Sequence, residues 1–426
     1  MNAARVCSSR LETCGGGAGI VCGHQHSATR VAEYKSERLP RRRDGEPNRS
    51  VLPSTDFRRR LQRLAVRLVP VLRLVALVGC SGDRIGEERK PSIAGPRLRT
   101  IDSLVLSEKG GVFVSKPNDI LAISDSRVLV SDAAVGRVLE YAADGDLRRT
   151  IGGRGRGPGE FASPGWMSLV GDSLLLVQNS PALRIEAFDL RSGEWRWGRR
   201  FTAKATTGLA SRDGVVLLGL LDATRHSSFV EFPDTLSELV ARGQLPYDAH
   251  DDPLLTDAFR LTQLAVHGSR IAQAFEVSNW LFVFGPGPAD VDSFHIAVAR
   301  RKGAPTRLLP LLRTNQSLGM KAVNHVSQPI ALGWLDSERV GVVTVDPDRT
   351  SPRYRGKAFV SVVNIRRREA CVDGALDVPS DPAPVATFRG DTLLVLYQDV
   401  SSTGAAETIV KRLHVDLTSC EWRTTQ

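Results

Sequence analysis

From Leu98 to the C-terminus, short apolar runs alternate with turns rich in Gly, Asp, Ser and Pro. Runs of this length and spacing predict an all-β fold, which could be a sandwich, a barrel or a propeller. Residues 1–57 differ, because they are rich in Arg, Gly and Ser and show no apolar periodicity. Such a composition does not bury a core, so we interpret this segment as a disordered or spuriously translated leader.

An internal repeat distinguishes among these all-β folds. The apolar run that ends at Asp132 returns as the run that ends at Asn179, 47 residues later. Both runs continue with an Arg-apolar pair and then an aromatic residue, which are Arg137-Val138 and Tyr141 in the first copy and Arg184-Ile185 and Phe188 in the second. The offset of 47 residues is kept throughout, so the two copies are repeats of one structural unit.

Four further copies of the apolar phrase follow, at Gly214–Leu218, Ser269–Ala274, Arg339–Val345 and Gly390–Leu396. Together with the first two, they place six repeat centres within residues 98–426. A repeat of roughly 40–50 residues that carries four strands is typical of a propeller blade. The sequence therefore predicts that residues 98–426 form a six-bladed β-propeller of four-stranded antiparallel blades.

The first two copies resemble the blades of the bacterial NHL-like six-bladed propellers. The residues that carry the resemblance are Val128–Asp132, Arg137-Val138, Tyr141, Asp144-Gly145 and the phrase Gly157–Phe161 shortly before Pro164. The resemblance is strong over residues 119–200 and fades over 203–320.

We interpret the Gly-rich stretch Gly152–Gly159 as a connection between blades whose glycines supply positive φ. It lacks the Lys-Ser/Thr of a phosphate-binding loop, although Arg154 and Arg156 could meet an anion there.

A ring of blades must be closed, because an open ring leaves unpaired strand edges. Arg99–Leu106 alternates well enough for a strand, and we expect it to join the last blade beside Glu407–Val415. Cys371 and Cys420 are the cysteines of the propeller region, and we expect both in that last blade. In an exported chain they predict one disulfide, whereas a thiol pair would fit a cytosolic protein.

The segment 58–80 has the order of a secretory signal, with arginines first, then an apolar stretch, then small residues. Its end, Leu77-Val78-Gly79-Cys80, resembles the bacterial lipobox, which implies lipid attachment to Cys80 and anchoring by acyl chains. Residues 81–97 then form a polar tether. The expected destination is the cell envelope, by default the outer membrane. An amphipathic helix that ends in Gly-Cys is the alternative, and Arg73 inside the apolar stretch favours it.

The net charge of +10 belongs to the N-terminal segment. Residues 1–80 hold 15 Lys and Arg against 6 Asp and Glu, which leaves 42 basic and 41 acidic residues in the rest. The propeller region thus has no electrostatic footprint for nucleic acid. No apolar run reaches the 18 or so residues of a membrane-spanning helix.

Four polar residues follow apolar runs and could supply oxygen ligands to Ca²⁺, namely Asp132, Asn179, Asn279 and Asp399. Some six-bladed propellers that this chain resembles are calcium-dependent lactonases or arylesterases, which makes such an enzyme the alternative function. Asp132 and Asn179 are equally well explained as repeat-equivalent residues that bond the backbone of their own blade.

No nucleophile elbow and no zinc-binding helix motif occurs, so we assign no catalytic residue and no cofactor. The sequence favours a monomeric, non-catalytic cell-envelope lipoprotein that binds or scaffolds a protein, peptide or carbohydrate.

Overall fold

The structure is a computed structural model of the chain. It describes residues 94–124, 127–179, 183–200, 205–212, 215–222, 227–233, 240–243, 262–275, 279–287, 290–296, 314, 327–346, 356–379, 383–400 and 406–425. The chain divides into two compact units, Met1–Glu88 and Arg89–Gln426, and every described residue belongs to the second. The leader, the signal segment and Cys80 lie outside the described residues. Within the described residues, no helix has the length and apolar character needed to cross a membrane.

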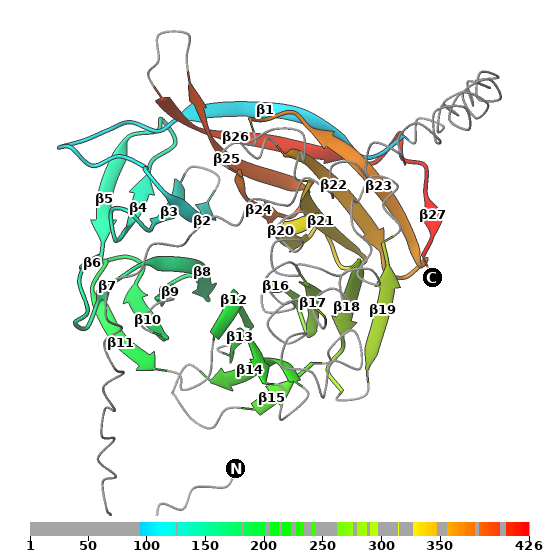
Figure 1. The fold of residues 1–426 in the computed structure, drawn as a ribbon, viewed down its shortest axis with the longest axis horizontal. Coiled ribbons are helices and arrows are strands. Elements are labelled where there is room, and N and C mark those ends of the chain that lie inside the picture. The colour runs from blue at the N-terminus through cyan, green and yellow to red at the C-terminus, as the bar shows by residue number, and fades with distance from the viewer. Residues whose placement is uncertain are drawn as a thin grey trace, which may run out of the picture. The chain divides into compact units, whose positions relative to one another are not determined.

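Five antiparallel sheets have the predicted four strands, and Figure 1 shows the sheets arranged around a common centre. The first contains β2 (Pro117–Ser124), β3 (Arg127–Asp132), β4 (Arg137–Tyr141) and β5 (Leu147–Ile151). The second contains β8 (Pro164–Val170), β9 (Leu174–Asn179), β10 (Arg184–Asp189) and β11 (Trp195–Arg200). The third contains β12 (Ala205–Arg212), β13 (Val215–Asp222), β14 (Ser227–Pro233) and β15 (Val240–Arg242). The fourth contains β16 (Thr262–His267), β17 (Arg270–Phe275), β18 (Trp280–Phe284) and β19 (Val291–His295).

The fifth of these sheets closes the ring, because the N-terminal strand pairs with the last long strand. It contains β24 (Val385–Arg389), β25 (Thr392–Val400), β26 (Ala406–Asp416) and β1 (Arg97–Val105). The register runs from Arg97 opposite Asp416 to Val105 opposite Ile409, which is the closure expected from the sequence.

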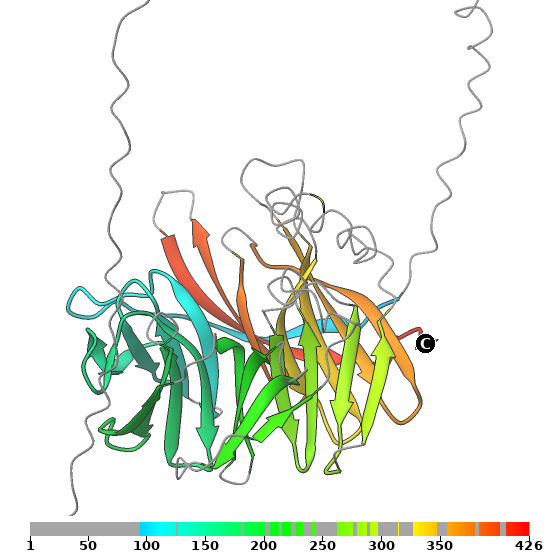
Figure 2. The same cartoon turned by 60° about the horizontal axis from the view of Figure 1, so that its bottom comes forward.

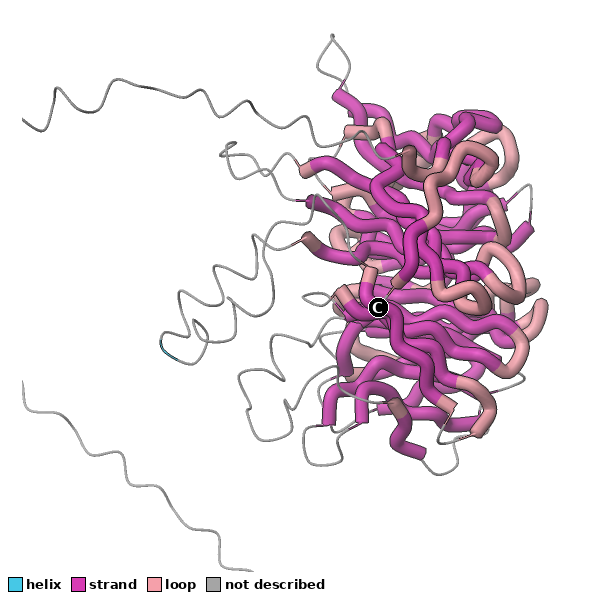
Figure 3. The backbone as a smooth tube through the Cα atoms, turned by 90° about the vertical axis from the view of Figure 1, so that its right-hand side faces the viewer, coloured by secondary structure: helices cyan, strands magenta, loops and turns pink. Residues whose placement is uncertain are grey.

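A further sheet departs from the uniform four-stranded pattern, because the C-terminal segment adds a fifth strand to its outer edge. It contains β20 (Gln328–Trp334), β21 (Arg339–Asp346), β22 (Lys357–Asn364), β23 (Glu369–Leu376) and the short β27 (Arg423–Thr424). Strands account for most of the described backbone, as the tube in Figure 3 shows.

The first strands of successive sheets lie against one another in a closed cycle, in the order β2, β8, β12, β16, β20 and β24 and then back to β2. Figure 2 shows the neighbouring sheets side by side. All six repeated apolar phrases fall on the second strand of a sheet, which is β3, β9, β13, β17, β21 or β25. The fold is therefore a propeller built from antiparallel blades, as the repeats predicted.

Successive side chains of a second strand pack into two different hydrophobic clusters. In β3, Val128 and Val130 pack in a cluster with Leu394 of the closing sheet. Leu129 between them packs in a different cluster with Leu175 of the second sheet. Because successive side chains of a strand point to opposite faces, a continuous apolar run fits a strand covered by a sheet on each side.

The connection between the first two sheets is the Gly-rich stretch. It forms a short parallel pair between β6 (Gly153–Arg154) and β7 (Glu160–Phe161). Gly152 and Gly159 have φ of 73° and 72°, and a Cβ on Gly152 would collide with the Phe161 ring. The glycines thus serve backbone conformation and close packing, as expected for a connection between blades.

Candidate functional site

Asp132 and Asn179, the two repeat-equivalent candidates for a cation site, are fully buried and bind backbone. The Asp132 carboxylate accepts hydrogen bonds from the amides of Ser115 and Lys116, at 2.6 and 2.8 Å. It also accepts from the amides of Ala134 and Val135, at 2.9 and 2.8 Å. Four amide donors therefore surround one carboxylate, and together they tie β3 to the chain that enters β2.

Asn179 makes the corresponding contacts one repeat later. Its Oδ1 accepts from the amides of Ala162 and Ser163, at 3.1 and 3.4 Å. These donors lie 17 and 16 residues before Asn179, which are the offsets of Ser115 and Lys116 before Asp132. Its Nδ2 donates to the carbonyl of Glu160 at 3.0 Å. Matching contacts at matching offsets mark both residues as parts of the repeat.

Asn279 and Asp399 belong to other sheets. Asn279 precedes β18, and its carbonyl accepts from the Ile296 amide at 2.9 Å. Asp399 lies inside β25, opposite Glu407, rather than after the strand, and it is exposed. The four candidates thus lie in or beside four different sheets. In the part of the chain that the structure describes, no group of three or more His, Cys, Asp and Glu side chains is placed to hold a metal ion.

Arg184 of the repeat and Arg154 of the Gly-rich stretch donate to main-chain carbonyls. Arg184 donates to the Arg156 carbonyl at 3.0 Å and forms an ion pair with Glu186. Arg154 donates to the Ala134 carbonyl at 3.2 Å. Arg184 therefore holds the connection between the first two sheets against the second of them.

Asp119 is a buried carboxylate on β2 that no motif in the sequence indicated. Its oxygens accept hydrogen bonds from the Ile120 amide at 2.9 Å and from the Met167 amide of β8 at 2.7 Å. Burial raises the pKa of Asp119 to about 7, against the opposing influence of these two amides. The side chain thus links the first strands of two sheets.

A pocket of about 430 Å³ lies where the closing sheet meets the first sheet, and we call it the seam pocket. It is lined by Ile101, Leu104, Ala122, Ser124, Arg127, Val128, Ala142, Ala143, Arg389, Asp391, Thr392, Leu394, Val410 and Arg412. Its volume falls within the range of about 300–1,000 Å³ that is usual for small-molecule sites. Val128, Leu394 and Val410 are buried, whereas Ile101 is 54% exposed.

Positive charge exceeds negative charge around the seam pocket. Arg127 of the pocket pairs at 3.0 Å with Glu140, which lies outside the pocket lining and also pairs with Arg149 at 2.6 Å and Arg148 at 3.7 Å. Arg412 pairs with Asp102, with 2.6 Å from Nε to Oδ1. The pocket residues include three arginines and one aspartate.

A second cavity, of about 950 Å³, lies between the fourth sheet and the sheet of β20–β23. Its charged groups are matched to one another. Arg366 pairs with Glu338 at 2.8 Å, and Arg368 pairs with Asp292 at 3.2 Å. Arg270 donates to the Ser337 carbonyl at 2.9 Å. These pairings make the second cavity a polar cleft.

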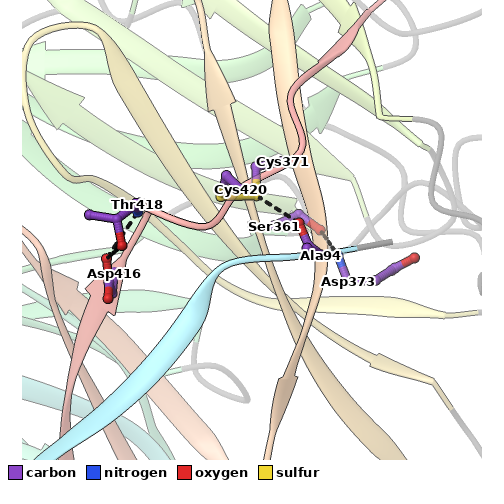
Figure 4. The surroundings of a disulfide bond; sticks show 7 residues. All are labelled: Ala94, Ser361, Cys371, Asp373, Asp416, Thr418 and Cys420. Atoms are coloured by element: carbon purple, nitrogen blue, oxygen red, sulfur yellow. Dashed lines mark hydrogen bonds between the residues drawn. A yellow bond between two sulfur atoms is a disulfide. The ribbon is translucent and has the colours of Figure 1, made fainter. Parts of the chain in front are cut away.

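A disulfide joins Cys371 and Cys420, with 5.7 Å between their Cα atoms (Figure 4). Its place corrects one expectation, because Cys371 lies in β23 of the preceding sheet and not in the closing sheet. The chain leaves β26 at Asp416, turns through Thr418, which donates to the Asp416 carboxylate, and crosses to β23. Ala94 lies beside this junction, where its carbonyl accepts from the Glu421 amide at 3.0 Å.

No protein-family model and no curated protein matches this chain. Among solved structures, it is similar to a Bacteroides fragilis protein described as exported, with a TM-score of 0.53 and 11% identity over 75% of this chain and 95% of that one. It is also similar to a member of the DUF4221 family from Bacteroides vulgatus, with a TM-score of 0.51 and 10% identity over 76% of this chain and 99% of that one. At these identities the likeness shows a shared fold, and that fold is a β-propeller.

Proposed function

We propose that the protein is an exported, monomeric β-propeller of the cell envelope that binds or scaffolds a protein, peptide or carbohydrate and performs no catalysis. The observation that carries the proposal is the engagement of Asp132 and Asn179 by backbone amides. For a carboxylate that accepts four amide hydrogen bonds, binding Ca²⁺ is energetically costly, because each amide that loses this acceptor stays buried and unpaired.

Export is supported by the segment 58–80 and by the disulfide. Disulfides persist in oxidising compartments and are rare in reducing ones, and this disulfide links two segments of the propeller. The description of the Bacteroides fragilis protein as exported agrees with this proposal. We also propose that the propeller has six blades and is NHL-like. In this proposal the sheet of β20–β23 and β27 is a blade whose outer edge carries an additional strand.

The proposed function is tested with the full chain against phenyl acetate and dihydrocoumarin, an aryl ester and an aryl lactone. We expect the same background hydrolysis with Ca²⁺ and with EDTA. The melting temperature should also be unchanged by Ca²⁺. Turnover that requires Ca²⁺ and is abolished by EDTA would instead establish the calcium-dependent lactonase or arylesterase.

The anchor is tested separately, in a bacterial host, by labelling with palmitate. We expect label on the wild-type chain, none on Cys80→Ser, and accumulation of an unprocessed form when globomycin is present. Equal labelling of the two chains would remove Cys80 as the lipidated residue and leave the propeller proposal in place.

A further inference from the structure

We propose that the seam pocket binds a small amphipathic anion, with an alkyl body against its apolar wall and an acidic head at Arg127. This inference goes beyond the proposed envelope function, since it assigns a ligand class and a place that neither the repeats nor the comparisons supply. It rests on the shape of the closing strand, on the apolar wall and on the surplus of positive charge.

The closing strand is distorted at the pocket. Thr100 of β1 pairs with Leu413, and Asp102 pairs with Arg412, so Ile101 between them has no partner in the register. Such a bulge turns a side chain away from the regular alternation and is frequent beside binding sites. Here it accompanies an isoleucine that is 54% exposed and lines the pocket.

The apolar wall of the seam pocket favours binding of a hydrocarbon chain. Ile101 faces a pocket whose other apolar members include the buried Val128, Leu394 and Val410. Covering apolar surface gains about 25 cal/mol for each Å² removed from water. An exposed isoleucine beside an apolar wall therefore favours an alkyl chain over a purely polar ligand such as a sugar.

The charge balance selects the head group. Arg127 lines the pocket, is 34% exposed at its side chain, and shares Glu140 with Arg148 and Arg149. Three arginines and one aspartate are among the described residues that line the pocket, so an acidic head at Arg127 is favoured over a basic one. Arginine offers a planar set of N–H donors that matches a carboxylate. Asp391, the one carboxylate among the described residues that line the pocket, has His414 as its neighbour at 3.3 Å.

Decanoate serves as the probe in isothermal titration calorimetry with the full chain. Decanol keeps the alkyl chain without the charge, and acetate keeps the charge without the chain. We expect saturable binding of one decanoate per chain and at least tenfold weaker binding of decanol and acetate. No saturable decanoate binding, or equal binding of decanol, would overturn the proposal.

Two matched pairs of variants locate the site. Arg127→Gln should weaken decanoate binding about tenfold or more, because it removes a charge-assisted hydrogen bond, whereas Arg148→Gln should not. Both arginines contact Glu140, but only Arg127 lines the pocket. Ile101→Asn should weaken binding, whereas Phe113→Asn should not, although Phe113 is also exposed, at 50%.

Each variant is checked for an unchanged melting temperature before its titration is read. Equal effects within either pair of variants would show that the probe binds elsewhere and would overturn the assignment. The proposed envelope function is decided by other measurements, namely hydrolysis and lipid labelling, so the two can fail independently.

Discussion

Asp132 shows how one side chain can hold a repeat together. Its carboxylate accepts hydrogen bonds from amides of the chain that enters β2 and of the turn after β3. Asn179 makes the first of these two sets of contacts at the same sequence offsets. The sequence indicated this equivalence, because both residues end matching apolar runs 47 residues apart. It could not identify the donors, because those lie in segments with no distinctive residue type.

Replacing Asp132 with Ala should lower the free energy of unfolding by at least about 3 kcal/mol, since four amides lose their acceptor. Urea denaturation followed by circular dichroism measures the change. Asp172→Ala is the control, because Asp172 is exposed, and it should stay within about 0.5 kcal/mol of the wild type. An Asp132→Ala chain as stable as wild type would contradict the structural role.

The buried hydroxyl of Tyr141 leads to a second prediction about a single residue. Tyr141 is fully buried, and its hydroxyl has no hydrogen-bond partner among the residues that the structure describes. The equivalent residue of the next repeat is Phe188, which lacks the hydroxyl. Tyr141→Phe should therefore leave the melting temperature unchanged or raise it, because an unpaired buried hydroxyl is removed. A fall of several degrees in calorimetry would show that the hydroxyl has a stabilising partner.

Asp119 should make stability depend on pH. Burial raises its pKa from 3.8 to about 7, so between these values the folded protein holds a proton that the unfolded chain has released. Stability of the wild type relative to Asp119→Asn should therefore fall as pH rises through this window and level off above it. Denaturation curves of both chains at several pH values measure the difference. A difference that stays constant with pH would contradict the raised pKa.

At the scale of elements, ring closure was predictable and the path of the C-terminal segment was not. Alternation in the first strand and the need to cover an open edge indicated the pairing of β1 with β26. The predicted disulfide between Cys371 and Cys420 is present, but the expectation that Cys371 lies in the last blade is wrong, because Cys371 lies in β23 of the preceding sheet. Nothing in the spacing of strands shows that the chain beyond β26 returns to β23. Gly95 and Gly374 allow the segment that enters β1 to lie close against β23 at the same junction.

The disulfide should stabilise the propeller through the segment it encloses. Cys371 and Cys420 are 49 residues apart, for which chain-entropy estimates give roughly 4 kcal/mol. Cys371→Ser should lose about that much stability under oxidising conditions. A reductant should bring the wild type down to the level of the variant. Equal melting of the two chains without reductant would show that the bond contributes no stability.

At the scale of the whole propeller, the seam pocket arises from closure itself. Its walls come from both ends of the described chain, from Ile101 to Arg412, and no local motif joins these residues. Repeat analysis finds what recurs in every blade, whereas this pocket exists only at the seam where the first and last sheets meet. That is the physical reason why the sequence indicated the fold and missed the pocket.

A methyl-detected NMR titration of the full chain with decanoate shows whether the ligand occupies the seam pocket, because it reports where the ligand binds. We expect the largest, saturable shifts at the methyl groups of Ile101, Leu104 and Leu394, which line the seam pocket. Val283 and Val291, which line the second cavity, should stay unperturbed. Shifts centred on those two valines, or spread over the molecule without saturation, would contradict binding in the seam pocket.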